Sequence, residues 1–94
     1  MPAGKQEAYQ LYMEAFPVFE KHFAPDDTYY ASLYKNLGLL FQETQEYERA
    51  VECLEKALVV IQGKPEYQKQ TMVIRRQIDR LLAVIRKQQQ EQFD

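Results

Sequence analysis

The sequence predicts an all-α protein in which four helices pack as antiparallel hairpins. The 94 residues include only three Gly and four Pro and are rich in Gln, Glu, Lys and Leu, a composition that favours helices. Apolar residues recur at spacings of three and four, as they do along one face of an α-helix. Breaks at 24–27, 44–46 and 63–65 separate the periodic segments and divide the chain into four helices.

The first predicted helix spans residues 5–23. Its apolar positions are Ala8, Tyr12, Ala15, Phe16, Phe19 and Phe23. Pro17 lies inside this segment and cannot donate a backbone hydrogen bond, and its ring clashes with the preceding turn. We therefore expect a bend near Phe16, or a helix that stops there and restarts.

The second predicted helix spans residues 28–43 and follows Pro25, Asp26 and Asp27. This start is favourable because an Asp side chain accepts hydrogen bonds from the first free backbone N–H groups. The stripe predicted to be buried is Tyr30, Leu33, Tyr34, Leu37, Leu40 and Phe41. Since Gly weakens a helix by about 1 kcal/mol relative to Ala, we expect Gly38 to let another helix approach closely.

The third and fourth predicted helices span residues 47–62 and 66–90, with Gly63 as a left-handed cap between them. One face of the third helix carries Ala50, Val51, Leu54, Ala57, Leu58 and Ile61. The apolar positions of the fourth helix include Ile74, Ile78, Leu81, Leu82 and Ile85.

An internal repeat links the first helix to the third. Ala8, Tyr12 and Ala15 have the same spacing as Ala50, Leu54 and Ala57, and the two sets lie 42 residues apart. Such a period is typical of a helical repeat array, in which each unit buries its apolar face only by stacking on a neighbour. The first helix is therefore predicted to be the second half of a repeat.

The residues at the centre of the chain resemble the tetratricopeptide repeat family. The matching positions are Tyr34, Leu37, Gly38, Phe41, Tyr47, Ala50, Leu54 and Ala57. The 42-residue period is similar to the longer repeats of the kinesin light chain type. Gln45 departs from the family pattern, because Gly is common there, so we expect a less tight or a strained turn.

The resemblance implies a single domain, residues 1–94, built as an α-solenoid. Residues 5–23 would be the second helix of a half repeat, 28–62 a full repeat, and 66–90 a capping helix. It also implies a scaffold or adaptor that binds a protein or peptide partner, since the first helices of such repeats line a groove. The groove residues carried over by position are Ser32, Lys35, Asn36, Leu39, Glu43, Arg75, Arg76 and Asp79.

Self-association is the alternative function. The first helix carries more aromatic residues than one contact with the second helix requires: Tyr9, Phe16, Phe19 and Phe23. An exposed aromatic patch predicts a partner, and a second copy would supply the missing half repeat. Equally, a bend at Pro17 would fold these rings into the chain's own core.

The fourth helix offers another surface for self-association. Residues spaced alternately by four and three form a seam typical of a coiled coil: Tyr67, Thr71, Ile74, Ile78, Leu81, Ile85, Gln88 and Gln92. The other interpretation is that this stripe covers the third helix. Pairing of two copies through the fourth helix is thus a second form of the self-association hypothesis.

The sequence offers little for catalysis or cofactors. His22 is the only histidine and has no evident partner, Cys53 fits a small packed thiol, and neither metal-ligand spacing nor a phosphate-binding loop occurs. We therefore expect no enzyme activity, no metal and no cofactor. No apolar run approaches the length of a membrane span, and a single cysteine fits a reducing compartment. We expect an intracellular, cytoplasmic protein without a membrane partner.

Charge is distributed unevenly along the chain. Residues 1–63 carry 5 basic against 10 acidic side chains, a net charge of −5, whereas residues 64–94 carry 7 against 4, a net charge of +3. The basic last helix does not indicate nucleic-acid binding, because the rest of the chain is acidic and no known nucleic-acid-binding motif is present. We interpret the charges mainly as solvated surface.

Overall fold

The protein is all-α, as the sequence predicts. The computed structural model describes residues 3–24 and 26–93, and this part contains four α-helices and no strand: α1 (Ala3–His22), α2 (Thr28–Glu43), α3 (Tyr47–Ile61) and α4 (Gln68–Phe93). A short 3-10 helix, η1 (Pro65–Tyr67), precedes α4. Pro25 and the side chain of Ala8, both used in the sequence argument, lie outside the described residues.

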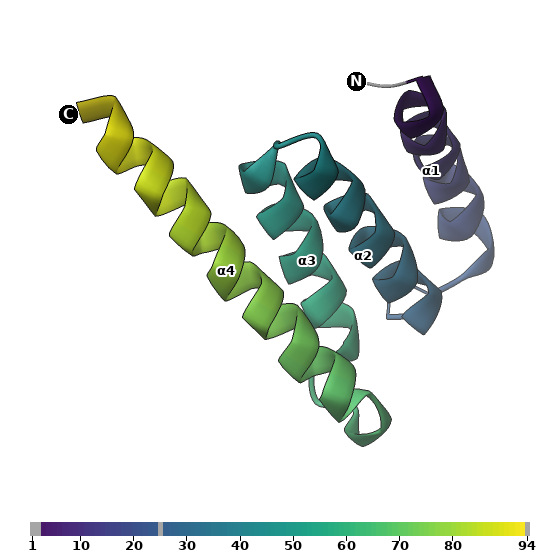
Figure 1. Ribbon diagram of the computed structural model, residues 1–94. Coiled ribbons are helices and arrows are strands. Elements are labelled where there is room, and N and C mark those ends of the chain that lie inside the picture. Colours follow the sequence, from purple (N-terminus) through teal and green to yellow (C-terminus); the bar gives the residue numbers. More distant parts are fainter. Residues whose placement is uncertain (1–2, 25, 94) are drawn as a thin grey trace.

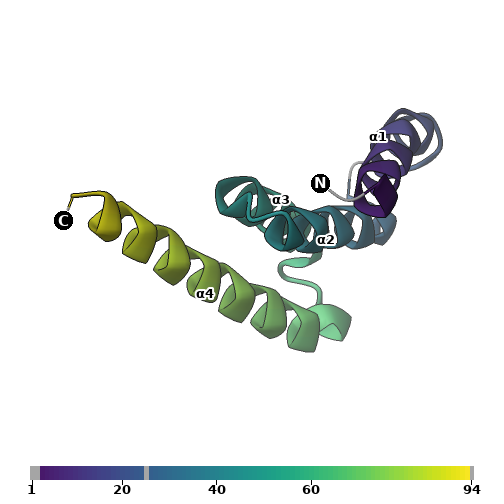
Figure 2. The same cartoon turned by 45° about the horizontal axis from the view of Figure 1, so that its top comes forward.

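The four helices follow one another across the molecule in chain order (Figure 1). Each packs on its neighbour in sequence, so α1 and α4 lie at opposite ends of the row. The principal-axis extents are 49 × 35 × 16 Å, which makes the row flat. The second view shows α4 diverging from α3 towards its C-terminal end (Figure 2). This arrangement leaves both faces of the central helix α2 partly uncovered.

The core lies between α2 and α3. Ala50, Leu54 and Ala57 of α3 are completely buried, and they face the part of α2 that contains Gly38. A Cβ atom added to Gly38 would lie 3.3 Å from the carbonyl oxygen of Ala50. Such a separation is tighter than most Cβ contacts. The predicted close approach of these two helices at Gly38 and Ala50 is therefore confirmed.

Local sequence determines where the helices begin and end. Asp27 precedes α2, and its side chain accepts a hydrogen bond from the backbone N–H of Tyr29 at 3.0 Å, as a helix cap does. Gly63 follows α3 with a φ of 82°. This left-handed conformation suits glycine, so the predicted cap after the third helix is confirmed.

The end of α2 is a Schellman motif with glutamine in the usual glycine position. The N–H of Glu46 donates to the carbonyl of Phe41 at 2.8 Å, and the N–H of Gln45 donates to that of Gln42 at 3.1 Å. Gln45 has a φ of 63°, where a side chain crowds its own backbone. The strained turn expected at Gln45 is thus present.

The helix bounds differ from the sequence prediction by one to three residues everywhere except in α2: α1 spans Ala3–His22 where 5–23 was predicted, and α3 ends at Ile61 where 62 was predicted. The helix α1 does not stop and restart at Pro17 but continues through it. Met13, whose carbonyl loses its helical donor, is exposed like Pro17, so we infer that water hydrogen-bonds to that carbonyl. The fourth helix starts with the 3-10 turn after Lys64 and runs past the predicted end at Gln90 to Phe93.

Candidate protein-binding surfaces

The predicted groove between α2 and α4 contains a hollow of about 350 Å³ near the start of α2. It is lined by Thr28, Tyr29, Ala31, Ser32, Lys35, Ile61, Tyr67 and Ile74. Two of the predicted groove residues on α2, Ser32 and Lys35, therefore line the same hollow as Ile74 of α4. Ile61 and Ile74 are each only 2% exposed, so they form an apolar floor beneath the exposed Lys35.

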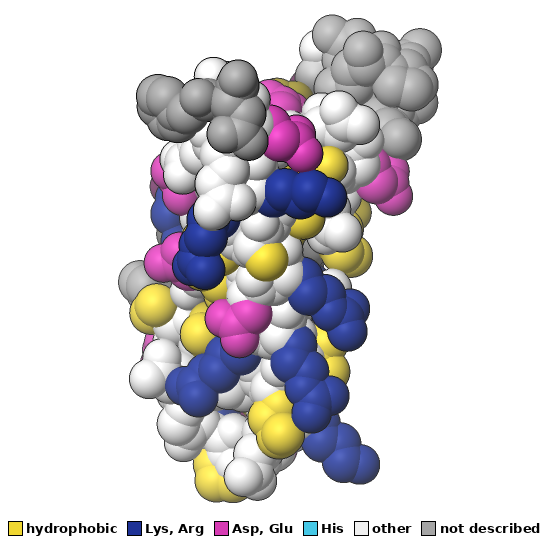
Figure 3. Space-filling model, turned by 60° about the vertical axis from the view of Figure 1, so that its left-hand side comes forward, with side chains coloured by type: hydrophobic (Ala, Val, Ile, Leu, Met, Phe, Trp, Pro, Cys, Tyr) yellow, Lys and Arg dark blue, Asp and Glu magenta, His cyan; other side chains and the backbone are white. Residues whose placement is uncertain are grey.

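The other predicted groove residues do not line this hollow. Asn36 and Glu43 are exposed along α2 with Leu39 half-buried between them, and Arg75, Arg76 and Asp79 are exposed on α4. Several Lys and Arg side chains, with fewer acidic ones, spread over the side of the molecule that carries α4 (Figure 3). Within the described residues, Lys35, Arg75, Arg76 and Asp79 form no ion pair with one another or with a neighbour. Their charges are available to a ligand.

The aromatic residues of α1 pack on α2 in antiparallel order. Ring centroids lie 5.6 Å apart for Tyr9 and Phe41 and 5.1 Å apart for Phe16 and Tyr34. Closer to the connecting loop, Phe19 contacts Tyr29 and Tyr30, and Phe23 contacts Tyr29. All four residues proposed for self-association are half-buried in this contact, including Phe23, which follows the end of α1. The rings join the chain's own core, although α1 is not interrupted at Pro17.

Other apolar side chains of α1 point to solvent. Leu11 is 66% exposed and Val18 is 54% exposed.

On α4, which carries the predicted seam, Ile74 and Leu81 are buried and Ile78 and Ile85 are half-buried. The stripe on α4 therefore packs against the body as far as Ile85, as expected if it covers the third helix, whereas Gln88 and Gln92 are exposed.

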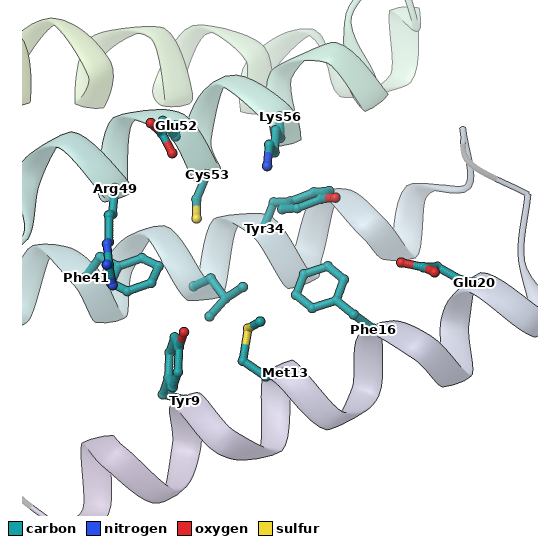
Figure 4. A pocket seen from close by; sticks show the side chains of 11 residues that line it. Tyr9, Met13, Phe16, Glu20, Tyr34, Phe41, Arg49, Glu52, Cys53 and Lys56 are labelled. Carbon is teal, nitrogen blue, oxygen red and sulfur yellow. The ribbon is translucent and has the colours of Figure 1, made fainter.

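A second hollow, which the sequence did not predict, lies between α1 and α3 above α2. This cleft has a volume of about 420 Å³ (Figure 4). It is lined by Tyr9, Met13, Phe16, Glu20, Tyr34, Leu37, Phe41, Arg49, Glu52, Cys53 and Lys56. Tyr9 and Phe16 are seven residues apart, and so are Tyr34 and Phe41. This equal spacing is the one sequence signal that these rings pack against each other. No pattern in the sequence predicts the gap between α1 and α3.

The residues considered for chemistry are placed apart from one another. His22 is exposed at the end of α1, and Cys53 is half-buried in the cleft. Burial raises the pKa of the Cys53 thiol and Glu52 adds to this effect, while Lys56 acts in the opposite direction. Among residues 3–24 and 26–93, no cluster of His, Cys, Asp or Glu fits a metal ion. None of the helices described here is both long and apolar enough for a membrane span.

A row of antiparallel helices, with small residues at the central contact and open surfaces on both sides, defines a helical repeat protein. The tetratricopeptide repeat model matches residues 3–60, which include α1, α2 and nearly all of α3. The chain therefore belongs to the tetratricopeptide repeat family, whose members generally act as protein–protein interaction modules and are typically not catalytic. No curated protein and no solved structure matches the chain significantly.

Proposed function

We propose that this protein is a scaffold or adaptor whose groove between α2 and α4 binds a peptide or a helix of another protein. The observation that carries the proposal is the position of Lys35. Its side chain lines the hollow over the buried Ile61 and Ile74, and it has no ion-pair partner among the described residues. A cation without an ion-pair partner in the described part of the chain, beside a hollow lined by both polar and apolar side chains, suits a ligand that carries both an anionic and an apolar group.

Lys35 and Asn36 would supply the polar contacts. The ammonium group of Lys35 donates three hydrogen bonds, and the amide of Asn36 both donates and accepts. A carboxylate or a backbone carbonyl of the ligand would accept from them, while an apolar side chain enters the hollow beside Ile74. Arg75 and Arg76 lie further along on α4 and favour an acidic ligand through their charge.

Peptides selected from a random library by binding to the wild-type protein would provide the probe. Affinity for the Lys35→Ala/Asn36→Ala variant should fall by about tenfold, the size expected when charge-assisted hydrogen bonds are lost. Both side chains are exposed, so the melting temperature should hardly change. If the peptides bound the wild-type protein and the variant with equal affinity, the groove between α2 and α4 would not be the binding site.

Self-association is the second candidate function, supported by the exposed Leu11 and Val18 on α1. Sedimentation equilibrium over a wide concentration range would detect a dimer. The Leu11→Asp/Val18→Asp variant should then be a folded monomer, because a charge on each partner is costly to bury. Phe19→Asp is a less specific test, since Phe19 also contacts Tyr29 and Tyr30.

The surface of α4 provides the matched comparison for this test. Val73 and Val84 are 49% and 38% exposed, and their separation of eleven residues places them on one face of α4, so the Val73→Asp/Val84→Asp variant tests pairing through α4. A dimer that survives both double substitutions would exclude pairing through either exposed surface. A wild-type monomer at all concentrations would exclude self-association altogether.

A further inference from the structure

The groove between α2 and α4 contains another hollow besides the one at Lys35. This distal hollow has a volume of about 270 Å³ and is lined by Gln42, Tyr47, Gln77, Arg80, Leu81 and Val84. It lies towards the end of the molecule at which α4 diverges from α3 (Figure 2). None of the α4 residues that line it was assigned to the groove from the sequence.

The two hollows follow one another along the same pair of helices. Lys35 and Gln42 are seven residues apart on α2, and Ile74 and Leu81 are seven residues apart on α4. Seven residues are close to two helical turns, so the members of each pair lie on one face and roughly 10 Å apart along the axis. A peptide that lies along the groove therefore reaches both hollows.

Each hollow is lined by one charged side chain among the described residues, and in both hollows it is a cation. Lys35 lines the first hollow and Arg80 lines the distal one. Neither side chain forms an ion pair or a hydrogen bond within the described part of the chain. Helix α4 as a whole carries 6 basic against 2 acidic side chains, a net charge of +4. The groove therefore presents two positive charges that no acid in the lining of either hollow neutralises.

Two acids lie beside the distal hollow in sequence but do not line it. Glu43 follows Gln42 on α2 and already interacts with another group of the chain. Asp79 precedes Arg80 on α4, and consecutive residues of a helix point about 100° apart. The sign of the charge inside the hollow is therefore set by Arg80.

We propose that the distal hollow is a second binding site of the groove, in which Arg80 binds an acidic side chain of the partner protein while Lys35 binds another. This second site rests on the proposed function, because the same partner occupies both hollows. A guanidinium group donates paired hydrogen bonds to a carboxylate, and the exposed amide of Gln42 adds further N–H donors. Val84, which is 38% exposed, offers apolar surface to a neighbouring side chain of the partner.

The spacing of the hollows limits the partner's sequence. A separation of roughly 10 Å corresponds to about three residues of an extended peptide or about seven residues of a helix. The partner is therefore an acidic segment whose two carboxylates are separated by one of these intervals, with uncharged residues between them.

Selection of peptides from a random library tests this specificity. The wild-type protein should select peptides with two acidic residues at a fixed interval, whereas Arg80→Gln should select peptides that keep only one of them. Arg75→Gln is the matched control, because it removes the same charge from the same helix. Arg75 does not line the distal hollow and points roughly 140° away from Arg80 around the helix. Peptides selected on this control should match those selected on the wild-type protein.

Affinity measurements with one wild-type-selected peptide identify the paired groups. Arg80→Gln should weaken binding by about two- to fivefold, the range for exposed ion pairs, and should have no further effect once the paired acid of the peptide is replaced by its amide. Arg75→Gln should change the affinity by less than about twofold, since exposed charges outside the contact are screened by salt. Circular dichroism confirms that each variant is folded.

Four results would overturn the second site. Selected peptides without a second acid, or affinity that does not respond to Arg80→Gln, would remove Arg80 from the site; if Lys35→Ala/Asn36→Ala still weakens binding, the proposed function stands. Failure of the wild-type protein to select any peptide would overturn both proposals. A wild-type dimer in sedimentation equilibrium that Arg80→Gln converts to a monomer would show that a second copy fills the distal hollow, in place of an acidic partner.

Discussion

A Cβ atom on Gly38 would lie 3.1 Å from Cγ of Leu54, so α2 and α3 approach each other closely at these two residues. Leu54 is completely buried, and its side chain occupies the space that a larger residue at position 38 would need. The contact between these two residues stabilises the hairpin of α2 and α3, and both candidate surfaces include residues of this hairpin. The first prediction therefore concerns its contribution to stability.

Leu54→Ala should lower the free energy of unfolding by about 2–5 kcal/mol, because it leaves a cavity at a completely buried position. Val59, on the same helix, is 74% exposed, and Val59→Ala should change stability by less than about 0.5 kcal/mol. Urea unfolding monitored by circular dichroism measures both. Similar losses for the two variants would show that Leu54 does not occupy the core.

Gln45→Gly should raise the free energy of unfolding by about 1 kcal/mol, since glycine adopts a φ of 63° without steric cost. The same substitution at Gln42, inside α2, should lower stability by about 0.5–1 kcal/mol. Thermal unfolding of both variants gives the comparison. A lower melting temperature for Gln45→Gly would contradict the Schellman motif at this turn.

Gln77→Met should stabilise the protein by about 1 kcal/mol. The Oε1 atom of Gln77 is buried and accepts no hydrogen bond from the described residues, and a thioether of similar size removes this desolvated acceptor. Gln70 is an exposed glutamine on the same helix, and Gln70→Met should have almost no effect. Destabilisation by Gln77→Met would indicate that the amide does have a partner.

The contact between Phe16 and Tyr34 should contribute about 0.5–1.5 kcal/mol beyond the burial of each ring. A double-mutant cycle with Phe16→Leu and Tyr34→Leu measures this coupling in the free energy of unfolding. Phe16 paired with Val59→Ala should show no coupling, because Val59 is exposed on α3. Additive effects of the two leucine substitutions would mean that α1 does not pack on α2 as described.

The hairpin of α2 and α3 could be predicted because its determinants are local. Gly38, Ala50 and Leu54 mark the close approach, and Asp27 and Gly63 mark helix ends through their own side chain or backbone. The course of α1 through Pro17 could not be predicted, since it depends on whether water reaches the freed carbonyl. The similarity to repeats of the kinesin light chain type stays a prediction, although membership of the tetratricopeptide repeat family is confirmed.

The groove and the cleft also differ in how far the sequence predicts them. Ser32 and Lys35 could be proposed as groove residues because the family pattern places them on the open face of a first helix, and both line the same hollow as Ile74. The cleft arises from the space between α1 and α3, two helices that are not neighbours in sequence. Periodicity within one helix carries no information about such a distance.

The most direct test of the central claim compares Lys35→Ala with Lys56→Ala. These substitutions are identical but lie on opposite sides of α2. Isothermal titration calorimetry with a peptide selected on the wild-type protein should show weaker binding to Lys35→Ala and unchanged binding to Lys56→Ala. Unchanged binding to Lys35→Ala would contradict the assignment of the groove between α2 and α4 as the partner-binding site.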